Sequence, residues 1–354
     1  MREKKSALII TMWGITNYGN RLQNYAVSKI ASDRGLEPFT LATKTEDDSG
    51  RVLLIKDFVR TIFFLCSGGK KRAIEVRKKK FRKFNHKYIP SIDNEKDIVA
   101  LQSEYVFLGS DQIWNAYYVE PNDMVYGKNS NKDRLICISP SFGVDEFDDG
   151  TERVIAEYLE PIQHLCVREK SGAELIKRLI GRDVPVFLDP TLMLTDKEWE
   201  KIERRPINVP TQKYVLKYFL KEESETSIRE ASEIIKKYKL EEVKLLDITR
   251  PWEYIVDPSE FVYLIHHADV VLTDSFHACV FSILFNKPFW VYKRMDSDMS
   301  SRMDTLFQTL GMENRFIHNV DAPYDINYQG VEKRLDLERT RFNTFIDGII
   351  REDV

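Results

Sequence analysis

One short segment constrains the fold more than any other, because it joins a strand buried on both faces to a helix. The run Ala268–Thr273 (ADVVLT) is largely apolar and rich in β-branched residues, which is typical of a parallel strand covered by helices on both sides. Asp274–Ser275 then supplies helix-capping chemistry, and a helix is predicted over Phe276–Asn286. His277 falls in its first turn, where a strand end and a helix N-terminus form a common site for a bound phosphate.

Strand-like and helix-like segments alternate along the rest of the chain, which predicts an α/β protein with parallel, helix-covered sheets. The first unit is expected to contain strands 7–13, 105–110, 134–140, 164–169 and 184–190 and helices 20–34, 151–163 and 171–180. The second is expected to contain strands 214–220, 243–248, 268–273 and 288–293, and helices ending at 237 and spanning 258–267, 276–286 and 301–311. This order predicts two Rossmann-like domains facing each other across a cleft.

The expected domain boundary is a proline-containing linker. Residues 205–212 (RPINVPTQ) follow a short helix that opens with a capping box. The linker divides an N-terminal domain, residues 1–204, from a C-terminal domain, residues 213–325. Residues 326–354 contain a final helix, predicted over 331–350.

Residues 51–87 interrupt the first domain as a helical insertion. Its first part, 51–66, is apolar around much of its circumference, whereas 70–87 is dense in Lys and Arg with Phe81 and Phe84 between them. One interpretation is a basic arm that lies on an anionic membrane surface or a charged glycan carrier. The other is a solvated helix face beside a buried helix. Nucleic-acid binding is not expected, because no recognisable binding fold surrounds the arm.

Composition excludes several classes of protein. The 53 basic and 56 acidic residues give a net charge of -3, which argues against a dedicated nucleic-acid binder. The four cysteines form no CxxC pair, so neither a disulfide framework nor a cysteine zinc site is predicted. No apolar run approaches the ~20 residues of a membrane span, and the apolar start at 7–13 has no cleavage site. We therefore expect a cytoplasmic protein, peripheral at most to the inner face of the membrane.

Two adjacent histidines, His266 and His267, lie near the end of a predicted helix. Adjacent helical residues point about 100° apart, so the pair is predicted to be a poor chelate with structural or solvent-facing roles. We expect no metal site in this chain.

Six short motifs in a fixed order make the chain similar to the polysaccharide pyruvyl transferase family. They are NYGNRLQNYA at 17–26, GSDQIWN at 109–115, SFG at 141–143, VREKS at 167–171, LDPT at 188–191 and TDSFH at 273–277. The resemblance covers roughly residues 7–320. It implies a GT-B-like pair of Rossmann domains and pyruvyl transfer from phosphoenolpyruvate, without a cofactor. The implied acceptor is a sugar of a cell-surface polysaccharide or of its lipid-linked precursor, with synthesis on the cytoplasmic side.

His277 and Arg168 are the residues to which the resemblance assigns the central roles. Forming a pyruvate ketal requires protonation of the enol methylene carbon, addition of two sugar hydroxyls and loss of phosphate. Histidine can give and take protons in these steps, and we predict that His277 is catalytic; its alternative role is capping or packing. Arg168 is predicted to act in catalysis and to hold the donor's carboxylate or phosphate. Its alternative is an internal salt bridge to Glu169 or Asp189.

The chain departs from many relatives at Ser275, where they carry a second arginine. Donor binding is therefore expected to use the helix N-terminus, with Ser275 and Phe276 in it, and Arg302 or Arg294 nearby. Asp111, at the end of another strand, is predicted to orient a hydroxyl or act as a base.

The predicted acceptor-binding residues lie in two loops of the first domain. The loop after the first strand offers amide side chains to sugar hydroxyls, and helix capping is an equal alternative there. A tryptophan after the 105–110 strand is expected to stack on a sugar face, unless it packs into the core. These residues are Asn17, Gly19, Asn20, Gln23 and Trp114.

Two other functions remain open at this point. A GT-B-like pair of domains with a phosphate-binding helix also suits a glycosyltransferase that uses a nucleotide sugar. A glycan-binding or scaffold protein of an assembly complex is a further possibility without catalysis. Gly19 lacks the partners of a dinucleotide fingerprint, so NAD binding is not supported.

Overall fold

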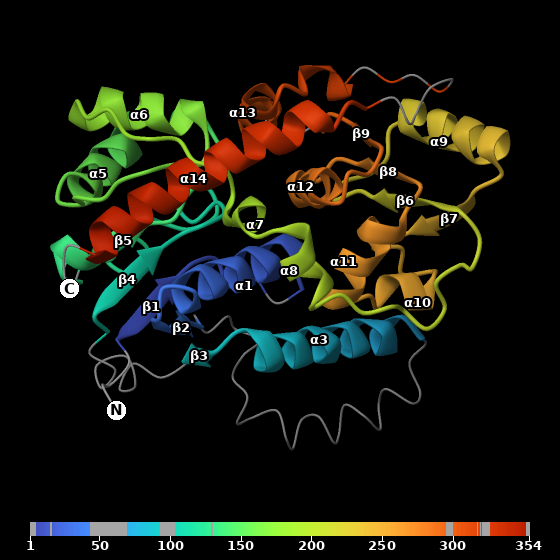
Figure 1. Ribbon diagram of the computed structural model, residues 1–354, viewed down its shortest axis with the longest axis horizontal. Coiled ribbons are helices and arrows are strands. Elements are labelled where there is room, and N and C mark those ends of the chain that lie inside the picture. The colour runs from blue at the N-terminus through green and yellow to red at the C-terminus, as the bar shows by residue number, and fades with distance from the viewer. Residues whose placement is uncertain are drawn as a thin grey trace.

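The computed structural model describes residues 5–14, 16–42, 69–92, 103–128, 130–294, 300–316, 318, 320 and 326–351. In these residues two parallel sheets lie side by side, one from each half of the chain (Figure 1). The first has the order β3–β2–β1–β4–β5, with β3 Ser91–Ile92, β2 Glu37–Leu41, β1 Ser6–Ile10, β4 Tyr105–Leu108 and β5 Leu135–Cys137. The second has the order β7–β6–β8–β9, with β7 Glu241–Lys244, β6 Tyr214–Tyr218, β8 Val270–Thr273 and β9 Phe289–Val291.

Helices cover both sheets, as the buried strands require. Every residue of β4 and β8 is buried, which matches strands packed on both faces. The helices of the first half are α1 Tyr18–Ser32, α3 Gly69–Tyr88, η1 Lys132–Arg134, α5 Asp149–Leu159, α6 Lys170–Ile180, α7 Pro190–Met193 and α8 Asp196–Glu200. Those of the second are α9 Glu225–Tyr238, α10 Pro251–Tyr254, α11 Pro258–His267, α12 Phe276–Leu284, α13 Ser300–Leu310 and η2 Glu313–Phe316. The two-domain α/β prediction is confirmed.

Two segments that were predicted as strands do not form regular strands, so these predictions are wrong. The segments 164–169 and 184–190 extend the first sheet beyond β5 only through single parallel bridges, Ile136 to His164 and Val167 to Val186. Pro185 has no N–H to continue a ladder, and Pro190 already opens α7. The short strands β2 and β3 escaped prediction, and the apolar helix expected at 51–66 lies outside the described residues.

The last helix, α14 (Gln329–Arg351), returns to the first half of the molecule. It runs diagonally across the assembly from α13 towards the side of β5 (Figure 1). Phe342 packs edge-on against Phe187 at 5.6 Å, and Arg339 donates to the carbonyl oxygens of Leu192 and Leu194, each at 2.9 Å. Because α14 also packs against α13, where Arg334 donates to the carbonyl oxygen of Leu310 at 3.2 Å, the C-terminal helix ties the two halves together.

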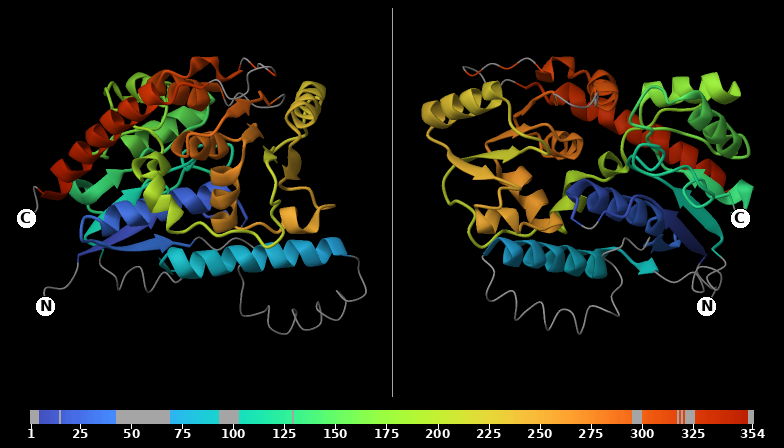
Figure 2. Two further views of the ribbon diagram at one scale, coloured as in Figure 1. Left: turned by 45° about the vertical axis from the view of Figure 1, so that its right-hand side comes forward. Right: turned by 180° about the vertical axis from the view of Figure 1, so that it is seen from behind.

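Helix α3 ties the halves together on the opposite side. Figure 2 shows it beneath both of them. Its buried Arg77 donates to the Tyr18 hydroxyl at 2.7 Å and to the carbonyl oxygens of Tyr254 and Val256 at 2.7 and 3.2 Å. Phe81 lies against Tyr18 at 5.3 Å. One face of the predicted basic arm is thus a structural interface. Among the described residues, no helix is both long and apolar enough to cross a membrane.

Candidate active site between the two halves

A cluster of buried charged side chains lies where the carboxyl end of β4 meets the N-terminus of α12. Ligand sites of open α/β sheets occupy this position. Each member is at most 7% exposed. Three members come from the first half and two from the second, so the cluster forms only when the halves meet. They are Asp111, Arg168, Asp189, His277 and Arg302.

His277 enters the cluster from the first turn of α12 and lies beside Asp189. Its Nε2 atom is 3.6 Å from Oδ2 of Asp189 and has no hydrogen-bond partner among the described residues. The other oxygen of Asp189 accepts from the backbone N–H and hydroxyl of Thr191, at 3.0 and 2.7 Å. Asp189 is therefore fixed as the N-cap of α7, and because it faces Nε2 of His277 it can orient the imidazole.

Arg168 joins the carboxylates of the cluster. Its guanidinium donates to Asp189 at 2.5 Å and to Asp111 at 3.3 Å, and it lies 4.8 Å above the ring of Phe276. The salt bridge to Asp189 that the sequence offered as an alternative is present, and Glu169 lies 3.9 Å away. Arg168 thus holds the site together and also lies against the first turn of α12.

Asp111 receives side chains from both halves. Asn20 of α1 donates to one of its oxygens, and Arg302 of α13 approaches the other at 3.9 Å. The backbone of Asp111 has a φ of 60°, a left-handed conformation that is uncommon outside glycine and is often found at functional sites. Asp111 and Arg302 thus belong to the same cluster as His277, and their predicted roles in orienting a hydroxyl and binding the donor stay predictions.

Electrostatics keep these carboxylates ionised although they are buried. Burial alone would raise the pKa of Asp111, but the charges of Arg168, His277 and Arg302 outweigh it and hold that pKa below its usual value. The same balance, with His277 and Arg168 opposing burial, holds the pKa of Asp189 well below its usual value. Burial, together with repulsion from Arg168, lowers the pKa of Arg302 to about 10. A bound anion beside Arg302, in addition to the Asp111 carboxylate, would therefore be stabilised by the charge of this guanidinium.

The N-terminus of α12 faces the same cluster. The carboxylate of Asp274 turns away and accepts from the backbone N–H groups of Leu220 and Lys221, at 2.7 and 3.2 Å. Arg294 binds Asp274 at 3.1 Å, so it supports this turn and does not reach the cluster. Ser275 is the N-cap of α12 without a side-chain capping bond. The Ser275 side chain therefore does not cap the first backbone N–H groups of α12, which lie beside His277.

Gly19 gives His277 the room it occupies. A Cβ atom at Gly19 would collide with the imidazole ring. We expect Gly19→Ala to displace that ring and to lower turnover by about 100-fold, the effect of a misplacement of about 1 Å. Steady-state kinetics would measure this. Gly348→Ala, in α14 with open space around the new methyl group, is the matched control and should keep full activity; equal losses in both variants would contradict the role of Gly19.

The structure does not bring every predicted acceptor residue to the site. Asn17 is exposed and caps α1 by accepting from the backbone N–H of Asn20 at 3.2 Å. Gln23 is fully buried, and its amide bonds Thr11 at 2.8 Å and the backbone N–H of Ser110 at 3.2 Å. Trp114 is 1% exposed and stacks on Tyr126 at 5.4 Å, so its ring is not open to a sugar. Gly19 and Asn20 alone among these five contact the cluster.

One partner in the site was not assigned from the sequence. Asp189 was named only as an alternative salt-bridge partner of Arg168, and its position beside His277 was missed. The signal was available in part, because Asp189 and His277 belong to two of the six motifs. Only the packing of α12 against α7 brings them together.

Solved structures with the same fold place the chain in the GT-B-like class of two-domain α/β proteins. A putative UDP-N-acetylglucosamine 2-epimerase from Listeria monocytogenes superposes with a TM-score of 0.53 and 11% identity, over 98% of this chain and 97% of its own. S. aureus MnaA, solved with UDP, gives 0.50 and 11%, also over 98% and 97%. At this identity the likeness concerns the fold alone.

The family assignment rests on the sequence profile. The profile described as polysaccharide pyruvyl transferase matches residues 17–296, which include all six motifs and four of the five charged residues of the cluster. The chain belongs to this family. No curated protein matches it significantly.

Proposed function

We propose that the protein transfers a pyruvyl group from phosphoenolpyruvate to two hydroxyls of one sugar in a cell-surface polysaccharide or its lipid-linked precursor. The observation that carries this proposal is the buried cluster around His277, in a chain of this family. An imidazole beside a buried carboxylate, next to guanidinium groups and a helix N-terminus, suits a reaction that moves protons on an anionic donor.

The proposed reaction balances without a cofactor. The enol methylene carbon gains a proton and becomes a methyl group. One sugar hydroxyl adds to the neighbouring carbon, and a second displaces phosphate from it. The two hydroxyls release two protons. One of them balances the proton gained by the methyl group, and the other leaves with the phosphate. The product is a cyclic ketal that retains the donor's carboxylate.

Each group of the cluster has a part in this proposal. His277 delivers or removes the proton, and Asp189 orients its ring from 3.6 Å. Arg302 and the first N–H groups of α12 bind the phosphate or carboxylate of the donor. Asp111, already bonded to Asn20, receives a sugar hydroxyl. Arg168 positions Asp189 and Asp111 from 2.5 and 3.3 Å.

Release of phosphate tests the proposal. The protein is incubated with phosphoenolpyruvate and a panel of lipid-linked or nitrophenyl galactosides, mannosides and glucosamine derivatives. Phosphate release that depends on one of these acceptors supports pyruvyl transfer. Release of a nucleoside diphosphate from a nucleotide sugar, with none from phosphoenolpyruvate, would overturn the proposal in favour of a glycosyltransferase.

We further propose that the exposed face of α3 holds the protein on an anionic membrane, where a lipid-linked acceptor would be found. The face opposite Arg77 and Phe81 carries exposed basic residues spaced three, four and seven apart, with one acidic residue, Glu75. The chain as a whole is acidic, with a net charge of -3, so this face is a local feature. The exposed basic residues of α3 are Lys70, Lys71, Arg72, Lys79, Arg82, Lys83, His86 and Lys87.

Charge reversal on this face should abolish binding to vesicles that contain phosphatidylserine or phosphatidylglycerol. Each basic residue near such a surface contributes about 1 kcal/mol, and salt weakens the attraction. Vesicle sedimentation would compare the wild type with a variant that carries Glu at 72, 79, 82 and 83. The matched control reverses four exposed basic residues of α9 and its C-cap, which lie away from α3 (Figure 1): Arg229, Lys236, Lys237 and Lys239. Equal losses in both variants would contradict a specific surface.

A further inference from the structure

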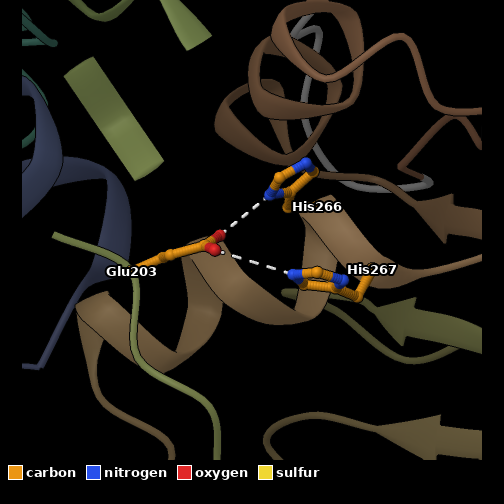
Figure 3. Close-up of side chains that lie close together, drawn as sticks. All are labelled: Glu203, His266 and His267. Atoms are coloured by element: carbon orange, nitrogen blue, oxygen red, sulfur yellow. Dashed lines mark hydrogen bonds and ion pairs between the residues drawn. The ribbon is translucent and has the colours of Figure 1, made fainter. Parts of the chain in front are cut away.

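A second cluster lies outside the site described above. It forms where the segment between the halves, residues 201–213 between α8 and β6, meets the end of α11. Glu203 follows α8 in that segment, and His266 and His267 are the last two residues of α11. Figure 3 shows both imidazole rings directed at the carboxylate from the same side of the helix. His266 also stacks on Phe285 at the C-terminal end of α12, eight residues from His277 and thus about 12 Å along the helix.

The potential ligand atoms converge closely. Nδ1 of His266 is 2.9 Å from one oxygen of Glu203, and Nε2 of His267 is 3.6 Å from the other. One ligand atom from each residue lies within 4.8 Å of the other two. Adjacent helical residues point about 100° apart. Here His266 uses Nδ1, close to its backbone, and His267 uses Nε2, at the tip of its ring, so both nitrogens reach the same carboxylate. The expectation that this pair chelates poorly did not consider that geometry.

Neighbouring rings hold both imidazoles in place. His266 stacks on Phe285 with ring centres 4.3 Å apart and an angle of 14°, and His267 stacks on Tyr263 at 4.1 Å and 29°. Their rotation is therefore restricted before any ligand binds. Preorganised ligands reduce the ordering that binding requires.

The donor set matches one class of ligand. Two imidazole nitrogens and one carboxylate oxygen are typical of zinc sites with three protein ligands and one water. The side chains are partly exposed, at 26% for His266, 42% for His267 and 19% for Glu203, so water can complete the coordination. Calcium and magnesium prefer oxygen ligands and fit this set poorly.

We propose that Glu203, His266 and His267 bind one zinc ion, which fastens the segment between the two halves to α11. The carboxylate of Glu203 accepts a hydrogen bond from His266 and lies 3.6 Å from His267. The ion replaces those contacts with coordination bonds and stabilises the closed arrangement of segment and helix. Because the cluster lies at the far end of α12 from His277, this proposal does not depend on the reaction assigned above.

Titration of the full chain with the metal alone tests the site. After treatment with a chelator, the wild type is titrated with Zn²⁺ by calorimetry and with Co²⁺ by absorption. We expect one equivalent of each to bind, with a rise in thermal stability. His267→Gln, the most exposed of the three changes, should weaken binding by at least about tenfold, because even indirect partners of metal ligands contribute that much. Glu203→Gln and His266→Gln should behave alike.

A matched histidine serves as the control. His164→Gln, whose ring bonds a backbone carbonyl at 3.1 Å in the first half, should bind both metals as the wild type does. The proposal is overturned if the wild type binds no equivalent of either metal. It is also overturned if His267→Gln and Glu203→Gln, checked for folding by circular dichroism, bind as tightly as the wild type.

Discussion

His277→Gln should lower the rate of acceptor-dependent phosphate release by about 100- to 10,000-fold, the range that general acid–base catalysis contributes. Glutamine fills a similar volume and can hydrogen-bond, but it cannot exchange a proton at neutral pH. Binding of phosphoenolpyruvate should change little, because the cations and helix N–H groups of the site remain. The loss should therefore appear in kcat and not in KM.

The control for this variant is another histidine of the same chain. His164 lies at the surface of the first half, so His164→Gln should keep the wild-type rate. Equal thermal stability of both variants would show that the fold is intact. Wild-type kcat in His277→Gln would exclude His277 as the proton-transfer group.

Arg168→Met should lower the free energy of unfolding by about 3–5 kcal/mol, because it leaves buried carboxylates without their cation. Arg168 bonds Asp189 at 2.5 Å and Asp111 at 3.3 Å inside the junction between the halves. Urea denaturation would measure the loss. Asp189→Asn in the Arg168→Met background should recover part of it, since one uncompensated charge is then removed.

A surface arginine gives the comparison for this second effect. Arg178 bonds Glu152, but its side chain is 51% exposed, so Arg178→Met should change stability by no more than about 1 kcal/mol. Similar losses for Arg168→Met and Arg178→Met would mean that the buried network does not depend on Arg168.

The central part of the fold could be predicted because its signals are local. Helix α11 has the predicted bounds, since Asp257 forms a capping box with Glu260 and Pro258 occupies the first turn. Strand β8 is recognisable by its unbroken apolar run. Strand β2, in contrast, contains a proline and an exposed glutamate and is fixed by pairing with β1, which no local pattern reveals.

The site could be predicted only where residues lie at strand ends. Asp111 and His277 follow β4 and β8, whose carboxyl ends lie at the junction of the halves, so their proximity follows from topology. Trp114 lies only three residues beyond Asp111, yet its ring turns into the core against Tyr126. Sequence places a residue near a strand end, but packing decides which of its neighbours remain accessible.

The convergence of Glu203 with two histidines has the same explanation. The residues are separated by more than 60 positions, and the angle between adjacent helical side chains argued against a chelate. Stacking on Phe285 and Tyr263 fixes which nitrogen each ring presents, so both rings reach one carboxylate, and the zinc site built on that arrangement stays a proposal.

The mass spectrum of an acceptor glycan, after incubation with the protein and phosphoenolpyruvate in deuterated water, tests the central claim most directly. We predict that the acceptor gains one pyruvate ketal whose methyl group contains deuterium from the solvent, and that His277→Gln yields almost none. An acceptor that stays unchanged with phosphoenolpyruvate but gains a sugar from a nucleotide sugar would contradict the account.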